Sequence, residues 1–170
     1  NFKSKNISRI GNFTVEIIEA VSPLFFDNKM KIVCLLSASS ILKILLPEEQ
    51  INKKIFKSYE NLIYDLKTEE WILTYIFWEQ LLFQELGYGN DLLKNIALKK
   101  NSESKIYQLM INDKKYQIPE FIITKKFKGI SKKEIKEGLY FNKLMLMENF
   151  TLPNKLKVPF NRNVLENYYN

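Results

Sequence analysis

Hydrophobic residues along this chain recur mostly with a helical period. Residues 28–46 are apolar on most faces, which predicts a central, largely buried helix capped by Asp27. A second, amphipathic helix is predicted to begin at Pro47, with two glutamates in its first turn, and to carry an apolar stripe as far as Leu66. A third helix is predicted to follow a Thr68 cap.

The third predicted helix ends at a glycine. Its apolar stripe includes Trp71, Tyr75 and Trp78, which are expected in the core because a helix must bury its apolar face. Gly87 stands where a helix ends in a left-handed residue, and Gly89 follows two places on. Both glycines indicate a helix stop, since a phosphate-binding loop requires a preceding strand and a Gly-Lys-Ser/Thr ending.

Two regions alternate apolar and polar residues with the period of a strand. The first is residues 9–19. The second is a pair of segments, residues 106–109 and 115–118, which flank a short turn-forming sequence and predict a small β-hairpin ended by Pro119. The pattern therefore predicts β structure at the N-terminus and an insertion between helices.

A capping box marks the next predicted helix. Ser131 is followed three residues later by Glu134, ahead of apolar residues that continue to Phe150. Gly138 is expected to weaken this helix slightly. A last, short helix is predicted over residues 161–169. The predicted fold class is mainly α, a helical bundle with a small β-hairpin insertion and a remnant strand of an N-terminal β domain.

The amino-acid composition limits which classes of protein this chain can belong to. Apolar residues make up 46% of the chain, enough for a hydrophobic core. The chain has no histidine and one cysteine, Cys34, which excludes an internal disulfide and a structural zinc site. Lys43 interrupts the apolar run of residues 28–46, which is shorter than the roughly 20 residues of a membrane span. We expect a cytoplasmic protein, and because the chain begins with Asn1, a fragment lacking its N-terminal portion.

Positive charge is concentrated in one part of the chain. Residues 99–143 contain twelve lysines and five acidic residues, a net charge of +7, whereas the remaining residues contain fourteen of each sign. Such a surface attracts polyanions through counterion release. The candidate binding cluster for DNA or an acidic partner is Lys125, Lys126, Phe127, Lys128, Lys132, Lys133 and Lys136. Phe127 offers a stacking ring within it. The alternative is a solvated, lysine-rich face.

The sequence argues against an enzyme. It lacks histidine, a plausible serine or cysteine triad, a metal cluster and a glycine-rich nucleotide loop, so neither catalytic residues nor a cofactor are expected. Cys34 lies in the most apolar predicted helix and is expected to be inert. Glu79 lies on a largely apolar helix face. It is expected to pair with a backbone end or a cation such as Arg162, because an unpaired buried carboxylate is costly.

Four motifs follow one another along the chain. Residues 9–13 read Arg-Ile-Gly-Asn-Phe, and residues 46–48 read Leu-Pro-Glu. Residues 78–92 contain a Trp-Glu pair, a leucine-rich turn, Leu-Gly-Tyr-Gly and an Asp-Leu closure. Residues 158–165 match a Leu-Pro-x-x-Arg-x-x-Leu motif with Val158 in the first position. This ordered set resembles the RecO family of bacterial recombination mediators.

The resemblance implies a domain organisation. Residues 1–21 would be the end of an N-terminal OB-fold, and residues 22–170 the helical C-terminal domain with a basic β-hairpin insertion at about 98–130. The family-motif positions expected to be structural are Arg9, Gly11, Trp78, Glu79, Gly87, Tyr88, Gly89 and Arg162. Asn95 stands where many relatives carry a cysteine, so the insertion is expected to be held by packing alone.

The resemblance also implies a function. Members of the family bind single- and double-stranded DNA, RecR and the C-terminal tail of single-stranded-DNA-binding protein, and thereby help RecA loading and strand annealing. Such a protein would be nucleoid-associated. Phe77 stands where many relatives place an arginine associated with binding that tail. The alternative is a non-catalytic structural or interaction domain that binds an acidic protein tail without contacting DNA, and a small enzyme is a third possibility.

Overall fold

The computed structural model shows a mainly α-helical fold with a small β insertion, as the sequence predicts. It describes residues 2–3, 12–14, 16–17, 19–88, 96–101, 104–111 and 114–169. The helical elements are η1 (Ser22–Phe25), α1 (Lys29–Leu45), α2 (Lys53–Asp65), α3 (Trp71–Glu85), α5 (Glu120–Thr124), α6 (Lys132–Leu146), the π-helix η2 (Met147–Thr151) and α7 (Phe160–Asn167). The strands are β1 (Phe2–Lys3), β2 (Asn12–Phe13), β3 (Ile96–Asn101), β4 (Ser104–Ile111) and β5 (Lys114–Ile118).

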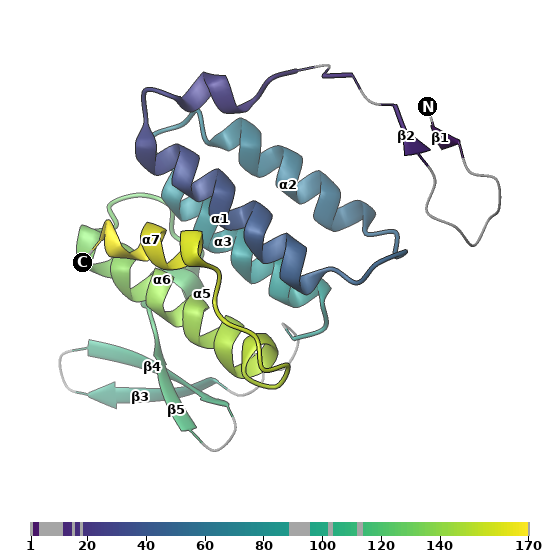
Figure 1. Cartoon of the computed structure of the whole chain (residues 1–170). Coiled ribbons are helices and arrows are strands. Elements are labelled where there is room, and N and C mark those ends of the chain that lie inside the picture. Colours follow the sequence, from purple (N-terminus) through teal and green to yellow (C-terminus); the bar gives the residue numbers. More distant parts are fainter. Residues whose placement is uncertain are drawn as a thin grey trace.

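The helices form one bundle around α1 and α3 (Figure 1). Helix α7 packs on α1, α2 packs on α3, and α6 lies between α3 and the sheet. As predicted, α1 is central and largely buried, with Cys34, Ala38 and Ile41 fully enclosed. Within the described residues, the helices are too short or too polar for one to span a membrane.

Three predicted helix starts were wrong in detail. The cap of α1 is Asn28, whose Oδ1 accepts a hydrogen bond from the Lys31 amide at 3.2 Å, and not Asp27. Helix α2 begins at Lys53 rather than at Pro47. The reason is Glu49, whose φ of 60° is left-handed and cannot belong to a right-handed helix.

The start of α3 also differs from the prediction. Helix α3 begins at Trp71 after Glu70, whose side chain makes no capping hydrogen bond. Thr68 does not cap it, because the Thr68 hydroxyl instead donates to the carbonyl of Asp65 at 2.8 Å, closing the end of α2. Thr68 therefore closes the C-terminal end of α2 and does not cap the N-terminus of α3.

The end of α3 is as predicted. Gly87 has a φ of 94°, and its amide donates to the Gln84 carbonyl at 3.0 Å. The Tyr88 amide donates to the Phe83 carbonyl at 2.9 Å, so the helix closes with a Schellman motif. A left-handed residue is required here, which explains the glycine. Gly89 lies outside the described residues.

The predicted β-hairpin is present and is part of a larger sheet. Strands β4 and β5 pair antiparallel, and β3, which the sequence did not reveal, pairs with the other edge of β4. Leu109 and Ile118 are buried against the bundle. The Tyr116 hydroxyl donates to Glu148 Oε1 of η2 at 2.7 Å, and Lys114 Nζ lies 3.2 Å from the same oxygen. The sheet is thus attached to the bundle by polar contacts as well as packing.

The N-terminal β structure is shorter than predicted. Strands β1 and β2 pair antiparallel and lie away from the bundle at the end of an extended segment (Figure 1). Among the described residues of the strand predicted over 9–19, Asn12 and Phe13 form β2, whereas Thr14, Glu16 and Ile17 are exposed outside regular structure. Arg9 and Gly11 lie outside the described residues.

Helix α6 begins with the predicted capping box. The Ser131 hydroxyl accepts from the Glu134 amide at 3.2 Å, and the Ser131 amide donates to Glu134 Oε2 at 2.8 Å. Gly138 has a role that its helix propensity does not suggest. A Cβ at this position would lie 2.5 Å from Cζ of Phe121 on α5, and 3.3 Å from Cδ1 of Ile76 on α3. The glycine therefore lets α5 approach α6 closely.

We expect Gly138→Ala to destabilise the protein although alanine favours helix. Because a 2.5 Å contact is closer than Cβ atoms normally approach, overpacking should cost the upper part of its usual range, about 2–3 kcal/mol. The gain in helix propensity is about 1 kcal/mol, so the free energy of unfolding should fall by about 1–2 kcal/mol. Urea denaturation followed by circular dichroism measures this. Adding Phe121→Leu should recover most of the loss, and an unchanged or raised stability of Gly138→Ala would contradict the close-packing argument.

Candidate functional site

The predicted lysine cluster lies on one part of the surface, here called the basic patch: Lys125, Lys126, Phe127, Lys128, Lys132, Lys133 and Lys136. All seven side chains are exposed. The first four follow α5, and the others lie on the first turns of α6. The chain reverses between the two groups, so the cluster surrounds the N-terminus of α6.

Local backbone geometry produces this reversal. Lys125 ends α5 in the left-handed conformation with φ 51°, and the Lys126 amide donates to the Phe121 carbonyl at 3.0 Å. Gly129 is also left-handed, with φ 67°, and Ser131 then caps α6. Two left-handed residues four positions apart turn the chain within one short connection. The lysines before and after the turn are thereby brought together.

Within the described part of the chain, the six lysines of the basic patch form no ion pair. Glu134 lies among them in the sequence, and its carboxylate is held by the Ser131 amide and hydroxyl at 2.8 and 2.7 Å. These hydrogen bonds, with the nearby charge of Lys126, lower the pKa of Glu134. Lysines at a helix N-terminus also oppose the helix dipole. The patch is therefore a concentration of positive charge, with acidic side chains beside it at Lys128 and Lys133.

An aromatic cluster lies beside these lysines. Phe127 is 44% exposed, and its ring centroid lies 4.5 Å from that of Phe77 on α3. Phe77 meets Phe121 edge-on at 6.0 Å. Phe77 is partly buried. It stands where the resemblance predicts an arginine, so this position contributes an aromatic ring to the cluster and not a positive charge. One side of the Phe127 ring is covered by Phe77, and the ring remains partly accessible to a ligand.

Glu79 and Arg162 form the buried ion pair that the sequence predicted. Arg162 Nε lies 2.6 Å from Glu79 Oε1, and Arg162 Nη2 lies 3.2 Å from Glu79 Oε2, so the contact is bidentate. Arg162 Nη2 also donates to the Leu139 carbonyl of α6 at 2.6 Å. Both charged side chains are fully buried. Burial opposes the charge of Arg162, but the adjacent carboxylate of Glu79 outweighs it and raises the pKa of the guanidinium.

Three further side chains complete this network. The Tyr75 hydroxyl donates to Glu79 Oε1 at 2.8 Å, and Asn142 Nδ2 donates to Glu79 Oε2 at 3.0 Å and to the Ile76 carbonyl at 2.8 Å. The Ser37 hydroxyl of α1 lies 2.8 Å from the Tyr75 hydroxyl. Burial and the charge of Glu79 raise the pKa of Tyr75, which keeps its hydroxyl protonated as the donor. The network therefore joins α1, α3, α6 and α7.

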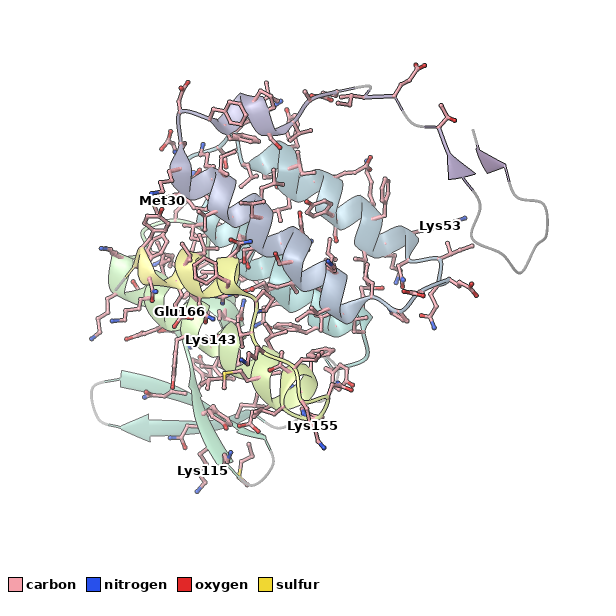
Figure 2. All side chains as sticks on the ribbon, viewed as in Figure 1. Met30, Lys53, Lys115, Lys143, Lys155 and Glu166 are labelled. Atoms are coloured by element: carbon pink, nitrogen blue, oxygen red, sulfur yellow. The ribbon has the colours of Figure 1, made fainter. Side chains whose placement is uncertain are left out.

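At its outer end the network reaches the surface. Arg162 Nη1 lies 3.5 Å from Glu166 Oε2, and Lys143 Nζ of α6 lies 3.3 Å from the same oxygen. Figure 2 shows Lys143 and Glu166 where α6 and α7 face one another. Charges thus alternate in sign along the path from the core to the solvent.

Three further residues singled out from the sequence lie in the core. Trp71 and Trp78 are buried, and Trp78 packs between Tyr59 and Tyr75 with centroid distances of 6.1 and 5.9 Å. Cys34 is fully buried, and this burial raises the pKa of its thiol, which favours the unreactive form. Among the described residues, no three of His, Cys, Asp and Glu are grouped as a metal site would require.

Sequence reasoning missed three members of the buried network: Ser37, Asn142, and Tyr75 as a hydrogen-bond donor. A signal for Asn142 was available, because it occupies a core-facing position of an amphipathic helix between Leu139 and Met145, where a polar residue needs a partner. Tyr75 gave no such signal, since a tyrosine in an apolar stripe is usual in a core.

Comparison with known proteins agrees with the resemblance seen in the sequence motifs. The family model described as Recombination protein O C terminal matches residues 30–137. Curated relatives named DNA repair protein RecO include those of Anaplasma marginale (strain Florida), 28% identical over 94 residues, and Caulobacter vibrioides (strain NA1000 / CB15N), 31% identical over 97 residues. These matches cover 55% and 56% of this chain and 40% of each relative. No solved structure gives a significant match.

We expect Arg162→Met to be strongly destabilising, because it leaves the Glu79 carboxylate buried without its cation. Breaking a buried ion pair in this way costs about 3–5 kcal/mol. Chemical denaturation measures the loss, and the double variant Glu79→Gln, Arg162→Met should recover much of it. Lys54→Met, which breaks the exposed ion pair of Lys54 with Glu85, is the matched control and should cost about 1 kcal/mol or less. Equal effects of the two single variants would contradict this role for Arg162.

Proposed function

This chain belongs to the RecO family, and from that premise we propose that it acts in DNA repair as a recombination mediator. In this proposal it binds single- and double-stranded DNA, together with RecR and single-stranded-DNA-binding protein, and so assists RecA loading and strand annealing. The protein contributes binding surfaces and no catalytic chemistry. Residues 1–21 would then end an upstream OB-fold, and residues 22–170 would form the helical domain.

The observation that carries the proposal is the cluster of six exposed lysines in the basic patch, which form no ion pair within the described residues. DNA releases condensed counterions when lysines replace them at phosphates, and this supplies sequence-independent affinity. Lysine is sufficient for this purpose because no base needs to be read. The patch surrounds the start of α6, which is fixed in the bundle through Leu139 and Asn142. Its lysines are therefore presented from a well-supported element.

The second candidate function is binding of an acidic protein tail without DNA contact. The observation that favours it is the Phe77–Phe127 stack next to Lys126 and Lys128. An acidic peptide that also carries an apolar or aromatic side chain would match both features, with carboxylates at the lysines and its ring against Phe127. The tail of single-stranded-DNA-binding protein is the partner proposed for this surface.

We expect DNA binding by this chain to depend steeply on salt, and the dependence to be lowered by removing patch lysines. Each phosphate contact contributes about 0.7 to the slope of log K against log salt for a single strand. The triple variant Lys125→Ala, Lys126→Ala, Lys128→Ala should reduce that slope by about 2 and weaken binding roughly tenfold to 100-fold at ~0.1 M salt. Fluorescence anisotropy with a labelled oligonucleotide measures both quantities.

The control for this experiment removes lysines elsewhere. Lys53 and Lys155 are exposed and lie far from the patch (Figure 2). Lys53→Ala and Lys155→Ala should leave the salt slope nearly unchanged. If wild-type affinity is flat between low and high salt, or if these control variants weaken binding as much as the triple variant, the proposed role of the patch is wrong.

Competition separates the two candidate functions. If the patch binds DNA, an acidic peptide with a C-terminal phenylalanine should displace the labelled oligonucleotide from wild-type protein, and the triple variant should bind both ligands weakly. If the chain is an interaction domain alone, the peptide should bind and the oligonucleotide should not bind even at low salt. Isothermal titration calorimetry with each ligand gives the two affinities directly.

A further inference from the structure

A groove lies beside the basic patch, between strand β5 and helix α6. It has a volume of about 620 Å³, and its lining includes Lys115, Tyr116, Glu120, Lys133, Glu137 and Tyr140. Most of its lining residues are polar or charged, and its apolar residues are Ile118, Pro119 and Leu144. Figure 1 shows β5 running beneath α6, and Figure 2 shows Lys115 on β5 at the outer edge of the sheet. The groove thus combines charged side chains with the aromatic rings of Tyr116 and Tyr140.

Tyr140 is the most prominent side chain of this groove. It is 54% exposed although it is a large aromatic residue on a helix that otherwise packs well. Lys133, Lys136 and Tyr140 are spaced three and four residues apart, so all three lie on the same face of α6. Lys133 and Lys136 belong to the basic patch. The exposed ring therefore continues the line of lysines along the helix.

The groove differs from the patch in its charge. Lys115 and Lys133 are balanced there by Glu120 and Glu137, so the groove attracts a phosphate less strongly than the patch does. An uncharged aromatic ligand with hydrogen-bond donors fits better. It would stack on Tyr140, and its amino groups would donate to the carboxylates. A nucleobase has this chemistry, since each base has a π-face and most carry an exocyclic amine.

We propose that this groove receives an unpaired base of single-stranded DNA, stacked on Tyr140, while the lysines of the basic patch hold the neighbouring phosphates. The inference rests on the proposed function, because it assumes that DNA reaches the patch. A duplex cannot enter in this way, since its bases are already stacked and paired. The groove thus gives this surface a preference for single strands that the lysines alone do not supply.

The test uses the whole chain and an oligonucleotide containing 2-aminopurine, whose fluorescence falls on stacking. Tyr140→Ala should weaken single-strand binding roughly five- to 100-fold, the range for losing one stacked base. It should abolish the fluorescence change and leave the salt slope unaltered, because tyrosine carries no charge. Tyr140→Phe should retain the stacking and bind within about twofold of wild type. Binding of a matched hairpin duplex should be unaffected by either substitution.

Tyr64 is the matched control. It is 69% exposed on α2, on the other side of the bundle from the sheet, and Lys67 Nζ lies 5.5 Å from its ring centroid. Tyr64→Ala should change neither affinity nor fluorescence. If Tyr140→Ala binds single strands as wild type does, the groove inference is overturned and the proposed function stands. If wild type binds neither DNA form at low salt, the proposed function fails and the groove inference fails with it.

Discussion

The bidentate contact between Glu79 and Arg162 is the constraint on which the bundle depends. Two charges that are fully removed from water are stabilising only when nearly every polar atom around them is paired. Here both carboxylate oxygens accept from Arg162 and from a further donor, Tyr75 or Asn142. The Leu139 carbonyl uses another guanidinium proton. An alternative packing of α3, α6 and α7 would break several of these contacts at once, so the network favours one arrangement of the helices over others.

The geometry of the basic patch and of the groove depends on this network. Leu139 and Asn142 fix the middle of α6, and Gly138 lets α5 approach the same turn through Phe121. With both helices held, the connection between them has little freedom, and it carries half of the basic patch. Tyr140 lies among these buried residues in sequence but points to the other face of the helix. Helix α6 thus supplies core contacts, three of the six patch lysines and one wall of the groove.

Much of this architecture was predictable because its signals are local. Helical periodicity, the capping box at Ser131 and the glycine after α3 each involve a few neighbouring residues. The ion pair was predictable because Glu79 lies on an apolar face and arginine is rare in this chain. The start of α2 was mispredicted because a left-handed Glu49 overrode a favourable local sequence. Strand β3 has no apolar–polar alternation, and the groove joins residues of β5, α5 and α6, so neither had a local signal.

The two kinds of cation in this chain have separate roles, and their chemistry explains the separation. A guanidinium is planar and weakly hydrated, so it tolerates burial and matches a carboxylate with two parallel hydrogen bonds. Arg162 accordingly lies in the core. An ammonium is strongly hydrated, and Lys132, Lys133 and Lys136 remain at the surface, where they keep their water and their mobility. A mobile, hydrated cation suits an irregular chain of phosphates, because contact then requires no fixed geometry. The core therefore needs arginine, whereas a surface proposed to bind polyanions can use lysine alone.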